Sequence, residues 1–405
     1  MIRFVASLLV VLLAGAAQAR PLTVASRDPA IEARIADLLA RMTLEEKVGQ
    51  MFMDSWTEKL DLDQIRAGGT GAVINCPTAA EVAKAQAAAR ESRLGIPLLI
   101  GRDVVHGYRT LFPVPLGLAA SFDRDLWRTS FSWMAREAAS DGLNLNLGPM
   151  LDVSRDGRWG RTVEGPGEDP WLAAEFARAS VFGLERGGLG ATLKHFVGYG
   201  APRAGRDYAE ADISTPTLHD VHLPAFAAGI DTGAVAAMAA FNTLNGVPGT
   251  ANRRMNQDLL ERDWGFDGFV LSDWDAIREL MNHGVAGTPE QATERAINGG
   301  LDMEIAGRFV PKHLAGLVRA GRVPMARVDD AVARILRAKF RLGLFEAPEA
   351  RAAALPPVKL GAAEIRAAAQ EAARRSIVLL KNEHDLLPLT RPRSEEHTSE
   401  LQSRV

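Results

Sequence analysis

The chain has 405 residues, of which 47% are hydrophobic and 24% are charged, and its formal net charge is −3. These values are typical of a soluble globular protein with one large domain or two ordinary ones, and the absence of a basic stripe argues against nucleic acid or an anionic membrane as a partner. The lone cysteine, Cys76, excludes an internal disulfide and any metal site built from several cysteines.

The N-terminus has the three parts of a secretory signal peptide. Arg3 supplies positive charge, residues 4–16 are apolar, and Ala17-Gln18-Ala19 has the form of an A-x-A cleavage site. The apolar stretch is too short to span a bilayer comfortably. We therefore expect residues 1–19 to be removed after Ala19, leaving a periplasmic or secreted protein without membrane contact; an uncleaved membrane anchor is the alternative.

Residues 20–345 show short apolar runs that alternate with helical patterns. Thr43 to Glu46 has the form of a capping box that begins a helix. The expected strands are 72–75, 96–102, 143–147, 191–195, 235–242, 269–272 and 301–305. The expected helices are 31–42, 78–93, 125–141, 171–186, 215–232, 257–263, 275–281, 289–298 and 325–341.

This alternation predicts the α/β class with a parallel sheet. Seven or eight units over about 300 residues favour a (β/α)8 TIM-type barrel, which need not be regular. A doubly wound open sheet is the alternative. No G-x-G-x-x-G follows an early strand, which weakens a dinucleotide-binding version of that alternative.

Beyond residue 345 the pattern changes. Residues 346–361 include Pro348 and Pro356 and are expected to form a linker. A helix at 362–375 and a strand at 376–381 then begin a second α/β domain, of which residues 362–392 are only the start, because one strand cannot bury both of its faces.

The last residues, 393–405, are polar and follow neither the helical nor the strand period. They look like a translated sequencing-adapter oligonucleotide. We therefore expect a non-native tail on a protein that is naturally longer; a genuine disordered tail is the alternative.

Polar residues lie at or after the ends of five expected strands. They are Asp103, Arg161 with Glu164, Lys194 with His195, Asn242, and Asp273 with Trp274. The carboxyl ends of parallel barrel strands share one face, and that face is where barrel enzymes perform chemistry. We therefore expect these side chains to form one site.

Such a set of side chains suits a sugar. Carboxylates accept hydrogen bonds from vicinal hydroxyls, arginine and lysine donate to hydroxyls and keep nearby carboxylates ionised, and tryptophan offers an apolar face to the C–H surface of a sugar ring. Glycoside hydrolysis needs two carboxyl groups. Asp273 fits the nucleophile, because a rigid, ionised carboxylate is required there.

Each residue also has a structural alternative. Asp273 could cap the helix 275–281, and His195 could bond a backbone carbonyl in the core. Asp103 could pair with Arg102 or Arg109 on the surface, Arg161 could form a loop salt bridge with Glu164, and Trp274 could belong to the core.

The sequence also allows two other kinds of active site. A metal site could use His106, His195 and a nearby aspartate, but no histidine pair has ligand spacing in a defined element. A Schiff-base enzyme could use the amine of Lys194. We expect neither a metal nor a cofactor.

Six ordered motifs resemble glycoside hydrolase family 3, in its two-domain β-glucosidase branch. The resemblance covers residues 31–389. The motifs are residues 42–51, 102–107 with 110–113, 158–161 with 164–170, 194–201, 241–242 with 245–246, and 268–274.

The resemblance implies roles for the site residues. Asp273 is then the nucleophile that forms a covalent glycosyl-enzyme with retention of configuration. Trp274 borders the leaving-group subsite, and Met238 and Glu164 lie near the pocket. The residues that bind the hydroxyls of the non-reducing sugar are Asp103, Arg161, Lys194 and His195.

The resemblance also implies a barrel followed by an α/β sandwich domain, and β-glucosides or short β-gluco-oligosaccharides as substrates. It allows a homodimer of the full-length protein. A β-xylosidase of the same family is an alternative, because the pocket around the sugar's C6 decides that specificity. A carbohydrate-binding or inactive chain is the second alternative.

One departure concerns the general acid/base. In the two-domain branch this residue is a glutamate of the second domain, and no residue of this chain matches it. The single-domain branch instead uses a histidine and an aspartate on the loop after the Lys-His strand. Here that loop, residues 199–208, contains no histidine, which favours the two-domain branch.

Overall fold

Eight parallel strands close into a barrel in the computed structural model, which describes residues 27–56, 59–346 and 358–388. The order around the barrel is β1-β10-β9-β6-β5-β4-β3-β2, and β1 pairs with both β2 and β10. The strands are β1 (Phe52–Ser55), β2 (Ala72–Ile74), β3 (Leu99–Arg102), β4 (Leu145–Asn146), β5 (Gly190–Phe196), β6 (Ala236–Ala239), β9 (Phe269–Trp274) and β10 (Met303–Ile305). The predicted (β/α)8 barrel is confirmed, and the open sheet is wrong because the sheet has no free edge.

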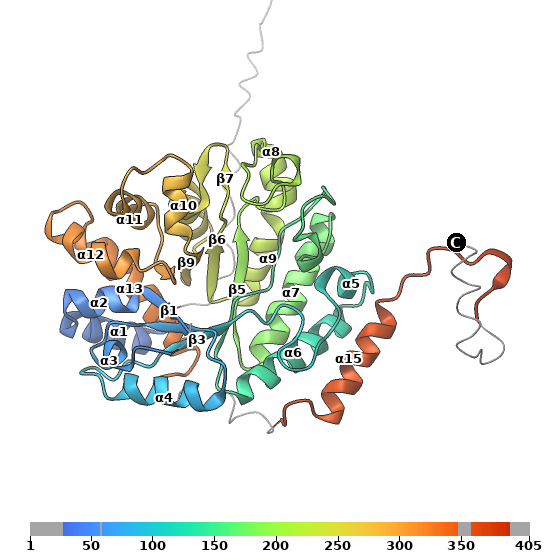
Figure 1. Ribbon diagram of the computed structural model, residues 1–405, viewed down its shortest axis with the longest axis horizontal. Coiled ribbons are helices and arrows are strands. Elements are labelled where there is room, and N and C mark those ends of the chain that lie inside the picture. Colours follow the sequence, from blue (N-terminus) through green and yellow to red (C-terminus); the bar gives the residue numbers. More distant parts are fainter. Residues whose placement is uncertain (1–26, 57–58, 347–357, 389–405) are drawn as a thin grey trace, which may run out of the picture.

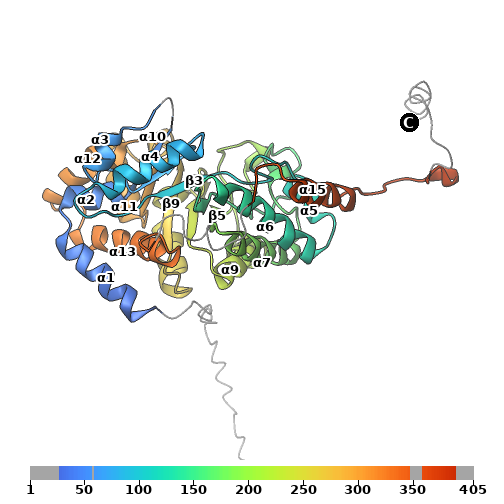
Figure 2. The same ribbon diagram turned by 90° about the horizontal axis from the view of Figure 1, so that it is seen from below.

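The helices surround this barrel (Figures 1 and 2). They are α1 (Pro29–Arg41), α2 (Leu44–Gln50), α3 (Leu62–Arg66), α4 (Ala79–Arg90), α5 (Pro115–Ala119), α6 (Arg124–Ser140), α7 (Pro170–Gly187), α8 (Thr215–Thr217), α9 (Pro224–Thr232), α10 (Ala276–Asn282), α11 (Pro289–Asn298), α12 (Phe309–Arg319) and α13 (Met325–Arg341). The capping box of α2 is confirmed: Thr43 Oγ1 accepts from the Glu46 amide at 3.2 Å, and Glu46 Oε2 accepts from the Thr43 amide at 2.9 Å.

Several parts of the barrel differ from the expected elements, among them strand β1 and helix α12, which were not expected. The helix expected at 215–232 is divided into α8, a π-helical turn (Leu218–His222) and α9, because Pro224 has no amide to continue the hydrogen bonding. An unexpected hairpin, β7 (Thr243–Leu244) with β8 (Val247–Pro248), follows β6. Its turn residues, Asn245 and Gly246, both have positive φ, the backbone that an Asn-Gly turn favours.

Among the described residues after the barrel, 358–388, there is a helix but no strand. Helix α15 (Ala363–Arg375) packs against α5 and α6, and the residues that follow lead away from the barrel (Figure 1). The strand expected at 376–381 is wrong: no strand of the described residues pairs with it, and Ile377 to Leu380 are exposed. The signal peptide and the adapter-like tail lie outside the described residues, as does most of the linker.

A buried carboxylate ties this segment to the barrel. Glu137 of α6 accepts hydrogen bonds from the amides of Arg109, Thr110 and Gly361, at 2.9, 2.8 and 2.8 Å, and from Thr110 Oγ1 at 2.8 Å. Burial would raise the pKa of Glu137, but these donors hold it below its ordinary value. One carboxylate therefore anchors both the loop after β3 and the residues that lead into α15.

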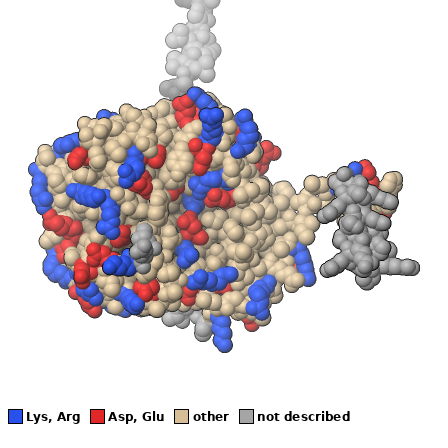
Figure 3. Space-filling view, in the orientation of Figure 1, with Lys and Arg blue, Asp and Glu red and all other residues tan. Residues whose placement is uncertain are grey.

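The molecular surface carries mixed charge. On the face seen in Figure 3, lysine and arginine side chains are interspersed with aspartate and glutamate and form no stripe of one sign. None of the helices in the described ranges is both long and apolar enough to cross a bilayer.

A lysine is buried at the amino-terminal end of the barrel. Lys339 of α13 is completely buried and donates to Gln50 Oε1 at 2.6 Å and to the Gly71 carbonyl at 2.8 Å. Burial lowers its pKa to about 7. At neutral pH the folded protein therefore holds this proton less tightly than the unfolded chain, in which the pKa is about 10.4.

This difference predicts a pH dependence of stability. Between pH 7 and pH 10 the unfolded chain binds more protons at Lys339, so the free energy of unfolding should rise with pH, by at most about 1.4 kcal/mol per pH unit from this group. The variant Lys339→Met should lack that rise. Urea unfolding of both proteins across this range measures the difference, and parallel curves would show that Lys339 does not titrate in this way.

Candidate active site

Three barrel strands bring four predicted site residues together at the carboxyl-terminal rim. Asp103 follows β3, Lys194 and His195 belong to β5, and Asp273 belongs to β9. Lys194 Nζ donates to Asp103 Oδ1 at 2.5 Å; the lysine side chain is 5% exposed and the aspartate 48%. The surface pairing of Asp103 with Arg102 or Arg109 is therefore wrong.

His195 lies between two carboxylates. Its Nδ1 is 2.8 Å from Asp152 Oδ2, and its Nε2 is 3.2 Å from Asp273 Oδ2, an ion-pair contact rather than a well-aligned hydrogen bond. Burial would lower the pKa of His195, but Asp152 and Asp273 raise it above its ordinary value. The alternative in which this ring bonds a core carbonyl is wrong.

Lys194 and His195 are consecutive, yet both contact carboxylates of the same cluster. Consecutive side chains of a regular strand point to opposite faces. The pairing of β5 with β6 shifts register between Lys194 and Phe196, and such an irregularity re-aims a side chain. One strand end can therefore supply two cations to one site.

Asp273 is a mostly buried carboxylate at the end of β9, with 15% of its side chain exposed. Its Oδ1 accepts from the Trp274 amide at 2.6 Å, and it does not cap α10, whose N-cap is Asp275. Burial would raise the pKa of Asp273, but His195 and Lys194 hold it below its ordinary value. Asp273 is thus ionised at neutral pH.

Trp274 follows Asp273 and is 46% exposed, so the alternative that assigns it to the core is wrong. Met238 is buried in β6, in register between Lys194 of β5 and Leu271 of β9. Asn242 is buried after β6, and neither polar atom of its side chain has a hydrogen-bond partner among the described residues.

Arg161 and Glu164 form the loop salt bridge that was one of the alternatives. Arg161 Nε and Nη2 donate to the two carboxylate oxygens of Glu164 at 2.8 and 3.1 Å. The pair nevertheless belongs to the same cluster. Burial would raise the pKa of Glu164, but Arg161, Lys194 and His195 lower it, and the Arg161 guanidinium lies 5.6 Å from the ring centroid of Tyr199.

Asp152 and Tyr199 also contact the cluster but were not predicted. Asp152 follows an apolar run after β4, and a charged residue after an apolar run is the signal that identified Asp103. The same signal could therefore have identified Asp152 as a site residue. Tyr199 is buried and meets the His195 ring edge to face at 5.0 Å between centroids. Its packing role depends on tertiary contacts and has no signal in sequence.

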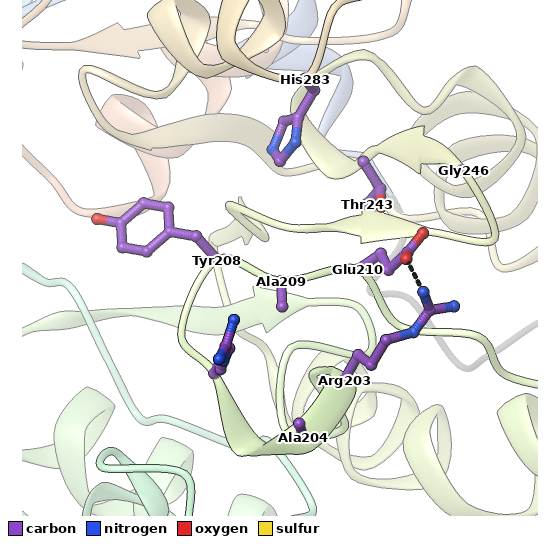
Figure 4. A pocket seen from close by; sticks show the side chains of 9 residues that line it. Arg203, Ala204, Tyr208, Ala209, Glu210, Thr243, Gly246 and His283 are labelled. Carbon is purple, nitrogen blue, oxygen red and sulfur yellow. Dashed lines mark ion pairs between the residues drawn. The ribbon is translucent and has the colours of Figure 1, made fainter.

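A hollow of about 510 Å³ lies beside this cluster (Figure 4). It is lined by residues of the 203–210 loop, by Thr243 and Gly246 of the hairpin and by His283, and Arg203 pairs with Glu210 across it. Tyr208 belongs to both regions. It lines the hollow, its ring packs against Phe241 at 4.6 Å between centroids, and burial, followed by the negative charge of Asp273, raises its pKa.

One group of carboxylates in the described residues has the spacing of a metal site. Glu261, Asp302 and Asp330 offer oxygens within 4.8 Å of one another. Arg327 pairs with Asp302 and Asp330, and Arg334 pairs with Glu261 and Asp330. Burial raises the pKa of Glu261 to about 8, so at neutral pH the two arginines balance the two remaining negative charges. Asp302 precedes β10, at the end of the barrel opposite Asp273, and this group is a buried salt-bridge network.

Comparison with known proteins identifies the family of this chain. The profile of the glycosyl hydrolase family 3 N-terminal domain matches residues 43–338. The periplasmic beta-glucosidase of Salmonella typhimurium is 41% identical over 385 residues, covering 91% of this chain and 50% of that protein. A beta-xylosidase of Formosa agariphila is 31% identical over 392 residues, covering 92% of this chain and 51% of that protein.

Solved structures show the same barrel. The beta-glucosidase from Listeria innocua in complex with isofagomine matches with a TM-score of 0.82 and 37% identity, over 88% of this chain and 52% of that one. An exo-1,3/1,4-beta-glucanase from a Pseudoalteromonas species matches with a TM-score of 0.84 and 36% identity, over 91% of this chain and 50% of that one. The chain spans about half the length of the curated relatives it matches.

The Lys194–Asp103 pair allows a test of the site's electrostatics. Asp103→Ala would leave a nearly buried ammonium without its partner, which should lower the free energy of unfolding by about 1–3 kcal/mol. Adding Lys194→Met should recover most of that loss, because the unpaired charge is removed. Urea unfolding of the two single variants and the double variant measures this coupling; strictly additive losses would contradict it.

Proposed function

The chain belongs to glycoside hydrolase family 3, and we propose that it carries the nucleophile and sugar-binding residues of a retaining, exo-acting β-glycosidase. Its substrates are β-glucosides or short β-gluco-oligosaccharides, from which terminal non-reducing β-D-glucosyl residues are released. The observation that carries this proposal is an ionised Asp273 at a barrel strand end, in contact with His195 and clustered with Lys194, Asp103 and Arg161.

The first step is attack by a carboxylate oxygen of Asp273 on the anomeric carbon. A C–O bond to Asp273 forms while the glycosidic C–O bond breaks, and the leaving group takes the bonding electron pair together with a proton from a general acid. Water then attacks the same carbon while giving a proton to the conjugate base of that acid, and Asp273 leaves as a carboxylate. Two displacements give retention of configuration.

The surrounding residues bind the sugar in this proposal. Asp103 accepts hydrogen bonds from hydroxyls, and Arg161 and Lys194 donate to them. His195, proposed from the resemblance as a further hydroxyl donor, instead acts through Asp273, because both of its ring nitrogens face carboxylates. The half-exposed ring of Trp274 borders the leaving group, with Glu164 and Met238 behind the pocket wall. The general acid/base is a glutamate of the second domain of this branch, and no residue of this chain is assigned that role.

The relatives support glucose over other sugars and an exported location. The 41%-identical relative is named a periplasmic beta-glucosidase, which supports a glucosidase in the periplasm or outside the cell, reached through the signal peptide 1–19. The beta-xylosidase among the relatives supports xylosides as the second candidate substrate. A homodimer of the full-length protein remains part of the proposal.

Covalent trapping tests the nucleophile. An activated aryl 2-deoxy-2-fluoro-β-glucoside should add one fluoroglucosyl group to the chain, because the fluorine slows the second step more than the activated first step. Peptide mass spectrometry should place the label on Asp273. Asp275→Asn, which changes a carboxylate two residues away that pairs with Arg278, should still be labelled, and Asp273→Asn should not. A label on any other residue would falsify the assignment.

The proposed assignment of the general acid to a glutamate of the second domain gives a second prediction. Leaving groups of low pKa need little protonation, whereas losing a general acid typically slows hydrolysis by about 10²–10⁴-fold. The 405-residue chain should therefore release phenolate from an activated aryl glucoside and hydrolyse cellobiose poorly. Glucose release from both substrates measures the ratio of their kcat/KM values. Comparable kcat/KM values for the two substrates would mean that a carboxyl group of this chain acts as the acid.

A further inference from the structure

Asp152 is a buried carboxylate that the proposed mechanism does not use. It lies after β4, is 3% exposed, and its Oδ2 accepts from both the His195 amide at 2.9 Å and the His195 Nδ1 at 2.8 Å. A buried carboxylate is costly unless a cation balances its charge. The cation that balances Asp152 must therefore be found among its neighbours.

His195 and His222 both interact electrostatically with Asp152, and Arg155 lies three residues further along the chain. Burial holds the pKa of His222 below its ordinary value, so that this imidazole is neutral at pH 7. Arg155 is an exposed residue of the following loop, and its Nε donates to the Glu168 carbonyl. The two hydrogen bonds from His195 are the direct contacts to Asp152 in the described residues, so His195 is the balancing cation.

The other side of the His195 ring leads to the same conclusion. Nε2 lies 3.2 Å from Asp273 Oδ2, so both ring nitrogens face carboxylate oxygens. An ionised carboxylate only accepts hydrogen bonds. With a proton on each nitrogen, the ring is an imidazolium whose positive charge faces both carboxylates, whereas a bare Nε2 would turn its lone pair toward Asp273.

We propose that Asp152 is a positioning residue: it holds His195 as an imidazolium and directs the Nε2 proton toward Asp273. This inference rests on the proposed function of Asp273 as nucleophile. Asp152 touches neither the sugar nor the reacting atoms in this scheme. If Asp152 were neutral, His195 could lose a proton and turn a nitrogen lone pair toward the Asp273 carboxylate, which is repulsive.

Other titratable groups around His195 also affect how its protonation depends on pH. Besides Asp152 and Asp273, the ring faces Tyr199, and Glu164 interacts with it electrostatically. Asp273 also interacts with Lys194. The lysine favours an ionised Asp273 without help from His195, so removing Asp152 should weaken the site without abolishing it.

The test compares Asp152→Asn with the matched control Asp54→Asn. Asp54 is a buried aspartate at the end of β1, on the same rim, and it pairs with Arg308 at 2.9 Å. The first readout is the rate of trapping by the activated 2-deoxy-2-fluoro-β-glucoside as a function of pH. The second is the protonation of His195 in ¹⁵N NMR spectra, with its signals assigned by their loss in His195→Gln.

The Asp152→Asn variant should be trapped by the fluoroglucoside at least about tenfold more slowly at pH 7. The alkaline fall in its trapping rate should move to lower pH by at least about one unit, because a neutral amide no longer stabilises the imidazolium. Its His195 should carry one proton at pH 7, against two in the wild-type chain. Asp54→Asn should keep the wild-type profile and a doubly protonated His195.

An unchanged alkaline limb in Asp152→Asn, with His195 still doubly protonated, would overturn the inference. If that variant does not fold, the wild-type spectrum still decides, since a singly protonated His195 at pH 7 is incompatible with the proposal. Failure of the proposed function gives a different result: the wild-type chain is not trapped at any pH, while NMR continues to report the state of His195.

Discussion

The negative charge of Asp273 depends on two cations from a strand that is not its neighbour. Asp273 ends β9, whereas Lys194 and His195 end β5, and β6 lies between them. Burial alone would favour the neutral acid. The hydrogen-bonded order β5-β6-β9 keeps these strand ends at a fixed separation, so the ionisation of one carboxylate depends on the pairing of three strands.

The strand-end pattern in the sequence located most of this arrangement. Short apolar runs that alternate with helical patterns predicted seven of the barrel strands, and the charged residues at strand ends identified Asp103, Lys194, His195 and Asp273, which the structure brings together. Strand β1 was missed, because Phe52–Ser55 directly follows helix α2 and is too short to show a period of its own. The family resemblance added roles for these residues, which their positions alone do not give.

The errors came from interactions that have no local signal. Residues 376–381 have high β-propensity, but a strand requires a partner, and none of the described strands lies beside them. The register shift in β5 that aims Lys194 and His195 at the same cluster is set by pairing with β6. The Asn245-Gly246 turn, in contrast, is a recognised local signal that was overlooked.

Glu137 connects two segments that are far apart in the chain. Its carboxylate holds Thr110, in the loop that follows Asp103, and Gly361, at the entrance to α15. Both segments share one anchor on α6, so a replacement at Glu137 disturbs the carboxyl-terminal rim and the attachment of the post-barrel helix at the same time. The effects of substitutions in the two segments on stability should therefore be coupled through Glu137, although the two lie about 250 residues apart in the chain.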